Sequence, residues 1–93
     1  MALAYDKRGK LLAVGHNSYT RTHRLQAHYA KKSGRPAAIY LHAELAALLK
    51  ARSQVYKMVV LRYNADGKPA LAKPCPACQL ALKDYGVKYI EHT

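Results

Sequence analysis

The sequence predicts one α/β domain in which a mixed four-stranded sheet carries helices, with the elements in the order β-β-α-β-α-β. Three observations predict this fold class. Two short apolar stretches near the N-terminus flank a polar loop, leucines recur at helical spacing in mid-chain, and a helix followed by a strand is repeated toward the C-terminus. Because each helix then joins two strands by a crossover, a mixed sheet with helices packed on it is expected.

The first expected element is a β-hairpin. Its strands are residues 2–5 and 11–14, and the loop between them is polar and contains a glycine where a positive φ angle is needed. Gly15-His-Asn17 ends the second strand. The following residues 18–38 are polar, basic and poorly periodic, although Leu25 and Tyr29 have the spacing of a short helix.

A buried helix is expected over residues 41–52, where leucines recur at helical spacing and alanines favour the helical backbone. The next stretch, 56–63, is β-branched and aromatic, which favours a strand, and Asn64-Ala-Asp-Gly67 then turns the chain.

The last expected elements are a helix over 76–85 and a strand over 87–91. Pro76 suits the first turn of a helix, and Gly86 is typical of the position after its end. This strand has no sequence after it that would cover its outer edge, so the edge favours a homo-oligomer.

Length and charge limit the class of protein. The chain has 93 residues, enough for one domain spanning 1–93, with no apolar run of the ~18 residues that cross a membrane and no signal peptide. We therefore expect a soluble, cytoplasmic protein. Sixteen Lys and Arg against five Asp and Glu give a formal charge of +11, which favours a polyanionic partner such as nucleic acid, with a solubility role as the alternative.

The chemistry-bearing residues lie at the starts of the two predicted helices. His42-Ala43-Glu44 opens the first, and Cys75 and Cys78, the two cysteines of the chain, open the second. Helix N-termini stabilise thiolates, and cysteines three residues apart point to the same side of the first turn, where both can reach one metal. Zn²⁺ accepts two sulfurs and an imidazole, so His42, Cys75 and Cys78 are the predicted ligands.

Three protein ligands leave the fourth zinc position for water, which is typical of a catalytic rather than a structural site. Glu44, two residues from His42, faces a different direction and is the predicted base that moves protons. Two other interpretations stay open. The cysteines could be a redox dithiol, or a structural zinc site could be closed by one of the remaining histidines, which are His16, His23, His28 and His92.

The motif H-x-E followed by P-C-x-x-C resembles the signature of the zinc-dependent cytidine and deoxycytidylate deaminase superfamily. The likeness extends from the hairpin and Gly15-His-Asn17 through residues 42–47 and 73–79 to 86–90. It implies a cytidine-deaminase-like three-layer fold and hydrolytic attack at C4 of cytosine, with Glu44 protonating N3 and helping ammonia to leave. It also implies that Asn17 contacts the sugar and that the Ala43 N–H touches the base.

Three departures from this family limit the likeness. The chain begins at the hairpin, where the family usually has a preceding helix, and it ends before a further strand and helix that the family usually adds. Adenosine deaminases of the transfer-RNA type usually have Met where this chain has Ala77, so cytosine is the expected base rather than adenine.

The substrate class is inferred from the basic segment between Asn17 and His42. Its residues include Tyr19, Arg21 and Arg24, and aromatic rings among cations suit single-stranded nucleic acid. We therefore expect conversion of cytosine to uracil in single-stranded DNA or RNA. The alternatives are a deaminase of free cytidine nucleotides or nucleosides, and a catalytically idle, zinc-stabilised module that binds nucleic acid.

Overall fold

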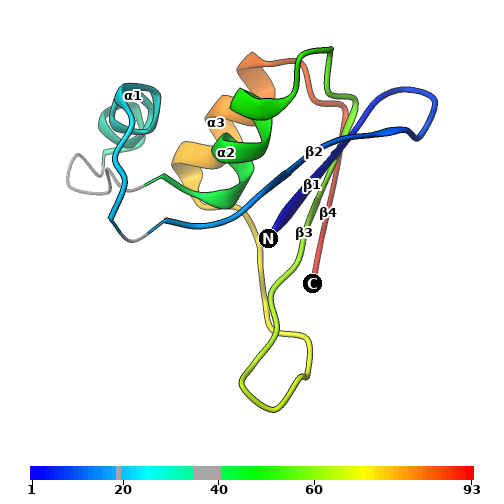
Figure 1. Ribbon diagram of the computed structural model, residues 1–93. Coiled ribbons are helices and arrows are strands. Elements are labelled where there is room, and N and C mark those ends of the chain that lie inside the picture. Colours follow the sequence, from blue (N-terminus) through cyan, green and yellow to red (C-terminus); the bar gives the residue numbers. More distant parts are fainter. Residues whose placement is uncertain (19, 35–40) are drawn as a thin grey trace.

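The computed structural model describes residues 1–18, 20–34 and 41–93. Within them the chain forms a mixed four-stranded sheet with three helices packed on it, which confirms the predicted fold class (Figure 1). The strands are β1 (Ala2–Tyr5), β2 (Leu11–Gly15), β3 (Lys57–Val60) and β4 (Tyr89–His92). The helices are α1 (Arg24–Lys32), α2 (Ala43–Lys50) and α3 (Pro76–Asp84).

The strand order in the sheet is β2-β1-β3-β4. Strand β1 is antiparallel to both β2 and β3, while β3 and β4 are parallel because α3 carries the chain back between them. The predicted hairpin and crossovers are therefore present, and β4 is an edge strand, as the sequence indicated.

The core lies between the sheet and the pair α2 and α3. Alternate strand residues point toward these helices, and Ala4 and Met58 are completely buried there beside Leu45 and Leu82. From the sheet outward, the layers are the sheet, α2 with α3, and α1, which packs on α3 (Figure 1). None of the described helices lies on the opposite face of the sheet.

Gly15 allows α2 to pack directly on the sheet. A Cβ atom at this position would lie 2.5 Å from the amide nitrogen of Ala47 and would overlap the carbonyl oxygen of Ala43. The absence of a side chain therefore sets how close the first turn of α2, with its candidate site residues, comes to β2.

Three predicted boundaries differ from the structure. The helix predicted over 41–52 is α2, which begins at Ala43 because its first turn is fixed by side chains from other segments, described below. The strand predicted over 56–63 ends at Val60, because the next residues leave the sheet and Tyr63 pairs with Pro69 instead. The strand predicted over 87–91 is β4, which begins two residues later, at Tyr89.

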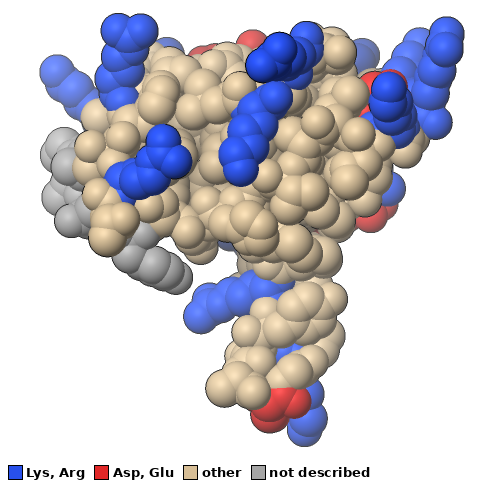
Figure 2. Space-filling model, in the orientation of Figure 1, with Lys and Arg blue, Asp and Glu red and all other residues tan. Residues whose placement is uncertain are grey.

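The surface is strongly cationic. Lys and Arg side chains stand at many places on the face seen in Figure 2, where Asp and Glu are few, and the ion pair found among the described residues joins Lys57 to Glu91 at 3.2 Å. In the described part of the chain, no helix is both long and apolar enough to cross a membrane.

Candidate metal centre

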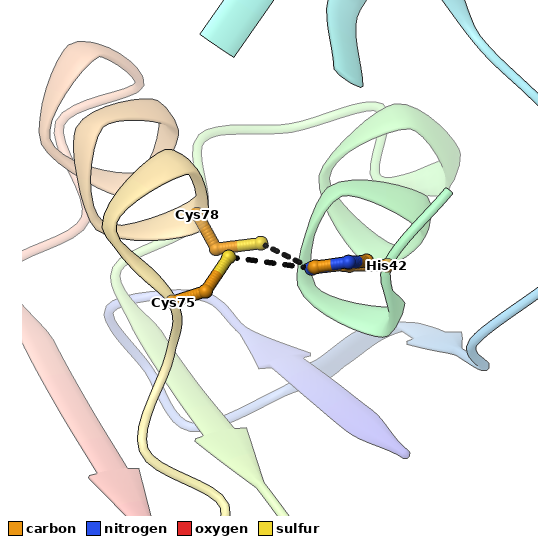
Figure 3. Close-up of side chains that lie close together, drawn as sticks. All are labelled: His42, Cys75 and Cys78. Carbon is orange, nitrogen blue, oxygen red and sulfur yellow. Dashed lines mark hydrogen bonds between the residues drawn. The ribbon is translucent and has the colours of Figure 1, made fainter. Parts of the chain in front are cut away.

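The three predicted ligands converge between α2 and α3 (Figure 3). His42 is the residue before α2, Cys75 is the residue before α3, and Cys78 lies in the first turn of α3. Their ligand atoms all lie within 4.8 Å of one another. The packing of the two helix N-termini thus brings together side chains that are far apart in the sequence.

The distances within this group fit a shared metal ion. The Nδ1 atom of His42 lies 3.4 Å from Sγ of Cys75 and 3.3 Å from Sγ of Cys78. A tetrahedral Zn²⁺ with ordinary Zn–N and Zn–S bond lengths would place nitrogen and sulfur about 3.6 Å apart. The donor set, an imidazole and two sulfurs, is also one that zinc prefers, so the residues present fit the metal that the sequence predicts.

The two cysteines are electrostatically different. The pKa of Cys75 is lowered to about 3, chiefly by its hydrogen bond with Cys78 and further by His42, against the opposing effect of burial. The pKa of Cys78 is raised well above its usual range by the same hydrogen bond, by burial and by the nearby Glu44 carboxylate. Of the two thiols, Cys75 therefore loses its proton more readily, and the thiolate is the form that binds metals.

Glu44 lies beside this group without belonging to it. Its side chain is buried, with 7% of its surface exposed, and it lines the same pocket as His42 and Cys75. Its charge is close enough to Cys78 to raise the pKa of that thiol. A buried carboxylate at the wall of the pocket, next to the metal-binding group, is well placed to move protons.

The pocket next to the candidate ligands has a volume of about 480 Å³. One wall comes from Asn17 and the start of α2, and the other comes from the end of β3 and the residues after it. The sequence did not indicate this second wall, whose side chains include Arg62, Tyr63, Leu71 and Lys73. Lys73 directly precedes the Pro-Cys motif, which is a signal that sequence reasoning could have used, whereas nothing local marks Arg62.

Two side chains from other segments hold the first turn of α2. The Ala43 N–H donates to Oδ1 of Asn17 at 2.8 Å, and the His42 N–H donates to Oε1 of Gln26 at 3.2 Å. These bonds satisfy backbone groups that have no partner inside the helix. The Ala43 N–H that we expected to touch a base is thus bonded to Asn17 in the structure, and both residues remain at the pocket wall.

Gln26 was missed by the sequence analysis. It lies in α1 with only 1% of its surface exposed, and its Nε2 atom is the buried side-chain polar atom without a hydrogen-bond partner in the described part of the chain. Its Oε1 atom fixes the backbone of a candidate ligand, so we assign it a positioning role for His42.

The predicted substrate contacts from the basic segment are not part of the pocket wall. Arg21 and Arg24 are exposed, and neither is among the residues that line the pocket. Tyr19 lies outside the described residues. Substrate binding by these side chains stays a prediction.

The other histidines have different surroundings from the candidate ligands. His23 accepts the Leu25 N–H at 3.0 Å and caps α1, and the ring of His28 packs edge-on against Tyr29. Within residues 1–18, 20–34 and 41–93, the candidate ligand group contains His42, Cys75 and Cys78 and none of these histidines. The described residues thus offer three ligands rather than a closed set of four.

Comparisons with known proteins found no match: no family model, no curated protein and no solved structure is similar enough to this chain.

Proposed function

We propose that this protein is a zinc-dependent hydrolase that deaminates cytosine to uracil, with single-stranded DNA or RNA as its substrate. The observation that carries the proposal is the buried Glu44 carboxylate beside a group of three metal-binding side chains, at the wall of one pocket. A metal with three protein ligands and an adjacent carboxylate suits hydrolysis better than structural support.

The metal and the chain have separate tasks. Zinc held by His42, Cys75 and Cys78 would supply a Lewis acid that lowers the pKa of water toward 7. Glu44 accepts the proton that the attacking water loses and delivers it to N3 of the base. The second proton of the water, on the hydroxyl now attached to C4, passes to the exocyclic amino group; the C4–N bond then breaks, so that cytosine and water give uracil and ammonia. Burial of Glu44 keeps bulk water from competing for these protons.

The remaining pocket residues suit a nucleotide. Asn17 lines the pocket near the start of α2, and the lining also includes two exposed cations, Arg62 and Lys73. Cations around a site for an uncharged base favour a substrate that brings phosphate with it.

The test is ammonia release from cytidine, deoxycytidylate and a cytosine-containing oligonucleotide, with zinc-loaded protein. We expect the oligonucleotide to give the highest kcat/KM. Glu44→Gln keeps the three ligands and the volume of the side chain, so its zinc content should stay near one per chain while turnover falls about 10²- to 10⁴-fold. Glu91→Gln is the matched control, because Glu91 is exposed in β4 and is not among the residues that line the pocket.

The outcomes separate the alternatives. Ammonia release from deoxycytidylate but not from the oligonucleotide would favour a free-nucleotide deaminase. Nucleic-acid binding without ammonia from any of the three compounds would favour an idle zinc-stabilised module. Full turnover by the Glu44→Gln variant would remove Glu44 from the mechanism.

A further inference from the structure

Residues 61–73 form an arm that projects from the body of the molecule (Figures 1 and 2). The chain leaves the sheet after β3, reverses direction and returns to α3. Backbone bonds hold the two sides of the arm together, from Ala70 N–H to Arg62 O and from Asn64 N–H to Lys68 O, each at 2.8 Å. Tyr63 also pairs with Pro69 in an antiparallel bridge. The arm is therefore an ordered hairpin-like loop that is held by its own backbone hydrogen bonds.

The base of the arm is fixed to the sheet. The hydroxyl of Thr93 donates to the Ala70 carbonyl at 2.6 Å and accepts the Arg62 N–H at 3.0 Å. The terminal amine of Met1 donates to the Leu61 carbonyl at 3.0 Å. These contacts set the position of the arm relative to the pocket, because Met1, Leu61 and Arg62 all line it.

The side chains of the arm are unusual for a surface loop. Tyr63 is 55% exposed and Leu71 is 71% exposed, although both line the pocket. Arg62, Lys68 and Lys73 are exposed as well, and none of them takes part in the ion pair found among the described residues. Figure 2 shows positive side chains both at the base and near the tip of the arm. An exposed aromatic ring among cations is the pattern with which proteins hold single-stranded nucleic acid.

We propose that the arm holds the part of a single strand that continues beyond the nucleotide in the pocket. Arg62 and Lys73 bind backbone phosphates, and Tyr63 stacks on a flanking base. This inference rests on the proposed function, since it assigns the path of the strand at the same pocket. A free nucleotide brings a single phosphate position and no flanking base, so it would leave Tyr63 and most of the arm's charge without a ligand. A second copy of this chain, with its own net charge of +11, is repelled from the same surface.

The primary test is binding, which does not require turnover. The probe is a fluorescein-labelled single-stranded DNA of about ten nucleotides with one central cytosine, titrated with zinc-loaded protein and followed by fluorescence anisotropy at several salt concentrations. The charge variant is Arg62→Gln with Lys73→Gln. Its matched control is Lys7→Gln with Arg8→Gln, which removes the same charge from the exposed β1–β2 loop.

If each arm cation contacts one phosphate, the slope of log K against log salt should become shallower by about 1.4 in the arm variant, from about 0.7 per contact. The control should lose less affinity and keep its slope. Tyr63→Ala should weaken binding about tenfold, as expected for the loss of one stacked base, while Tyr63→Phe should bind like the wild type. Zinc content and Tm should be the same in all variants.

Equal losses of affinity in the two charge variants would overturn the proposal, because binding would then depend on net charge alone. Unchanged binding by Tyr63→Ala would show that Tyr63 does not stack on a flanking base, and would overturn that part of the proposal. Deamination of the oligonucleotide and of deoxycytidylate, measured beside binding by the arm variants, separates this inference from the proposed function. If neither compound is deaminated but the arm variants still lose binding, the proposed function fails and the arm assignment stands. If deoxycytidylate is deaminated and the arm variants bind normally, the arm assignment fails alone.

Discussion

At the level of single residues, Cys78 gives the sharpest test of the metal centre, because only 2% of its surface is exposed and serine nearly matches its volume. We expect Cys78→Ser to lose bound zinc, since a hydroxyl is a poor zinc ligand. The free energy of unfolding should fall by about 4 kcal/mol, the stabilisation from a ligand present at a thousand times its Kd. Metal content by elemental analysis and urea unfolding would measure both effects.

A chelator provides the control for this substitution. When zinc is removed, the Cys78→Ser variant and the wild type should unfold at nearly the same urea concentration, because the remaining difference is one sulfur atom. A zinc-replete variant with wild-type metal content and stability would contradict the ligand assignment.

Gly15 tests the close approach of β2 and α2. In Gly15→Ala the new Cβ must displace the backbone of Ala43 and Ala47, so we expect a loss of about 3 kcal/mol in stability, as for an overpacked core. Because Ala43 follows His42, zinc affinity should fall as well.

Gly9→Asn is the comparison for Gly15→Ala. Gly9 has a φ of +85°, a Cβ added there would have no atom within 4 Å, and asparagine tolerates such backbone angles. The substitution should cost less than about 1 kcal/mol and leave zinc affinity unchanged. Equal stability of the two variants would show that α2 can move away from the sheet without penalty.

How far sequence predicts the site depends on the separation of its residues. His42, Glu44, Cys75 and Cys78 belong to two short motifs, and the helix propensity around each motif places them at helix N-termini. Gln26 and Arg62 contribute through contacts made only after the chain has folded. A single glutamine or arginine in the sequence carries no information about such long-range partners.

At the level of secondary-structure elements, Tyr29 links α1 to α3. Its hydroxyl donates to Oδ2 of Asp84 at 3.0 Å, and burial together with this carboxylate raises the pKa of Tyr29 to about 12. The folded protein therefore holds the phenol proton more tightly than the unfolded chain does. The resulting stabilisation is complete below about pH 10 and is lost as the pH rises toward 12.

We expect Tyr29→Phe to be less stable than the wild type by about 1 kcal/mol at pH 7, the usual net contribution of one hydrogen bond. The difference between the two proteins should shrink as the pH rises from 10 to 12, because only the wild type loses this bond. Urea unfolding at several pH values would measure it, with Tyr63→Phe as the exposed control. A difference that does not change with pH would contradict the assigned role of Tyr29.

The elements themselves were largely predictable. Apolar periodicity located α2, and Pro76 and Gly86 marked the ends of α3, with Gly86 at a φ of +74°. The end of β3 was not predictable, because Leu61 and Tyr63, which also suit a strand, follow Val60 at the point where the chain turns into the arm. Local propensity contains no information about where the strands that pair with β3 come to an end.

At the level of the whole molecule, β4 is the last strand of the sheet, no other described strand pairs with its outer edge, and its residues are exposed, including Tyr89 and Ile90. Such an edge favours pairing with another chain, while the net charge of +11 opposes it. We expect self-association to rise with salt, because salt screens the charge without weakening backbone hydrogen bonds. Light scattering at low and high salt would measure the mass.

Ile90→Lys should keep the protein monomeric at high salt, since a lysine on an edge strand disfavours pairing. Leu49→Lys is the matched control: it adds the same charge at a similarly exposed apolar residue, which lies in helix α2 and not in the sheet. A monomeric mass of the wild type under all conditions, or equal behaviour of the two variants, would contradict the role of the edge.

The order of strands in the sheet has a consequence for the speed of folding. Strand β1 pairs with β2, its neighbour along the chain, and also with β3, where Met1 and Leu61 are sixty residues apart. Contacts between distant residues close slowly, so the hairpin is expected to form early and the central pair late. The imidazole and the two sulfurs, which come from different helices, then meet only after the slow step. Zinc would therefore leave the folding rate almost unchanged and would act mainly by slowing unfolding, so that a bound metal would govern how long each molecule stays folded.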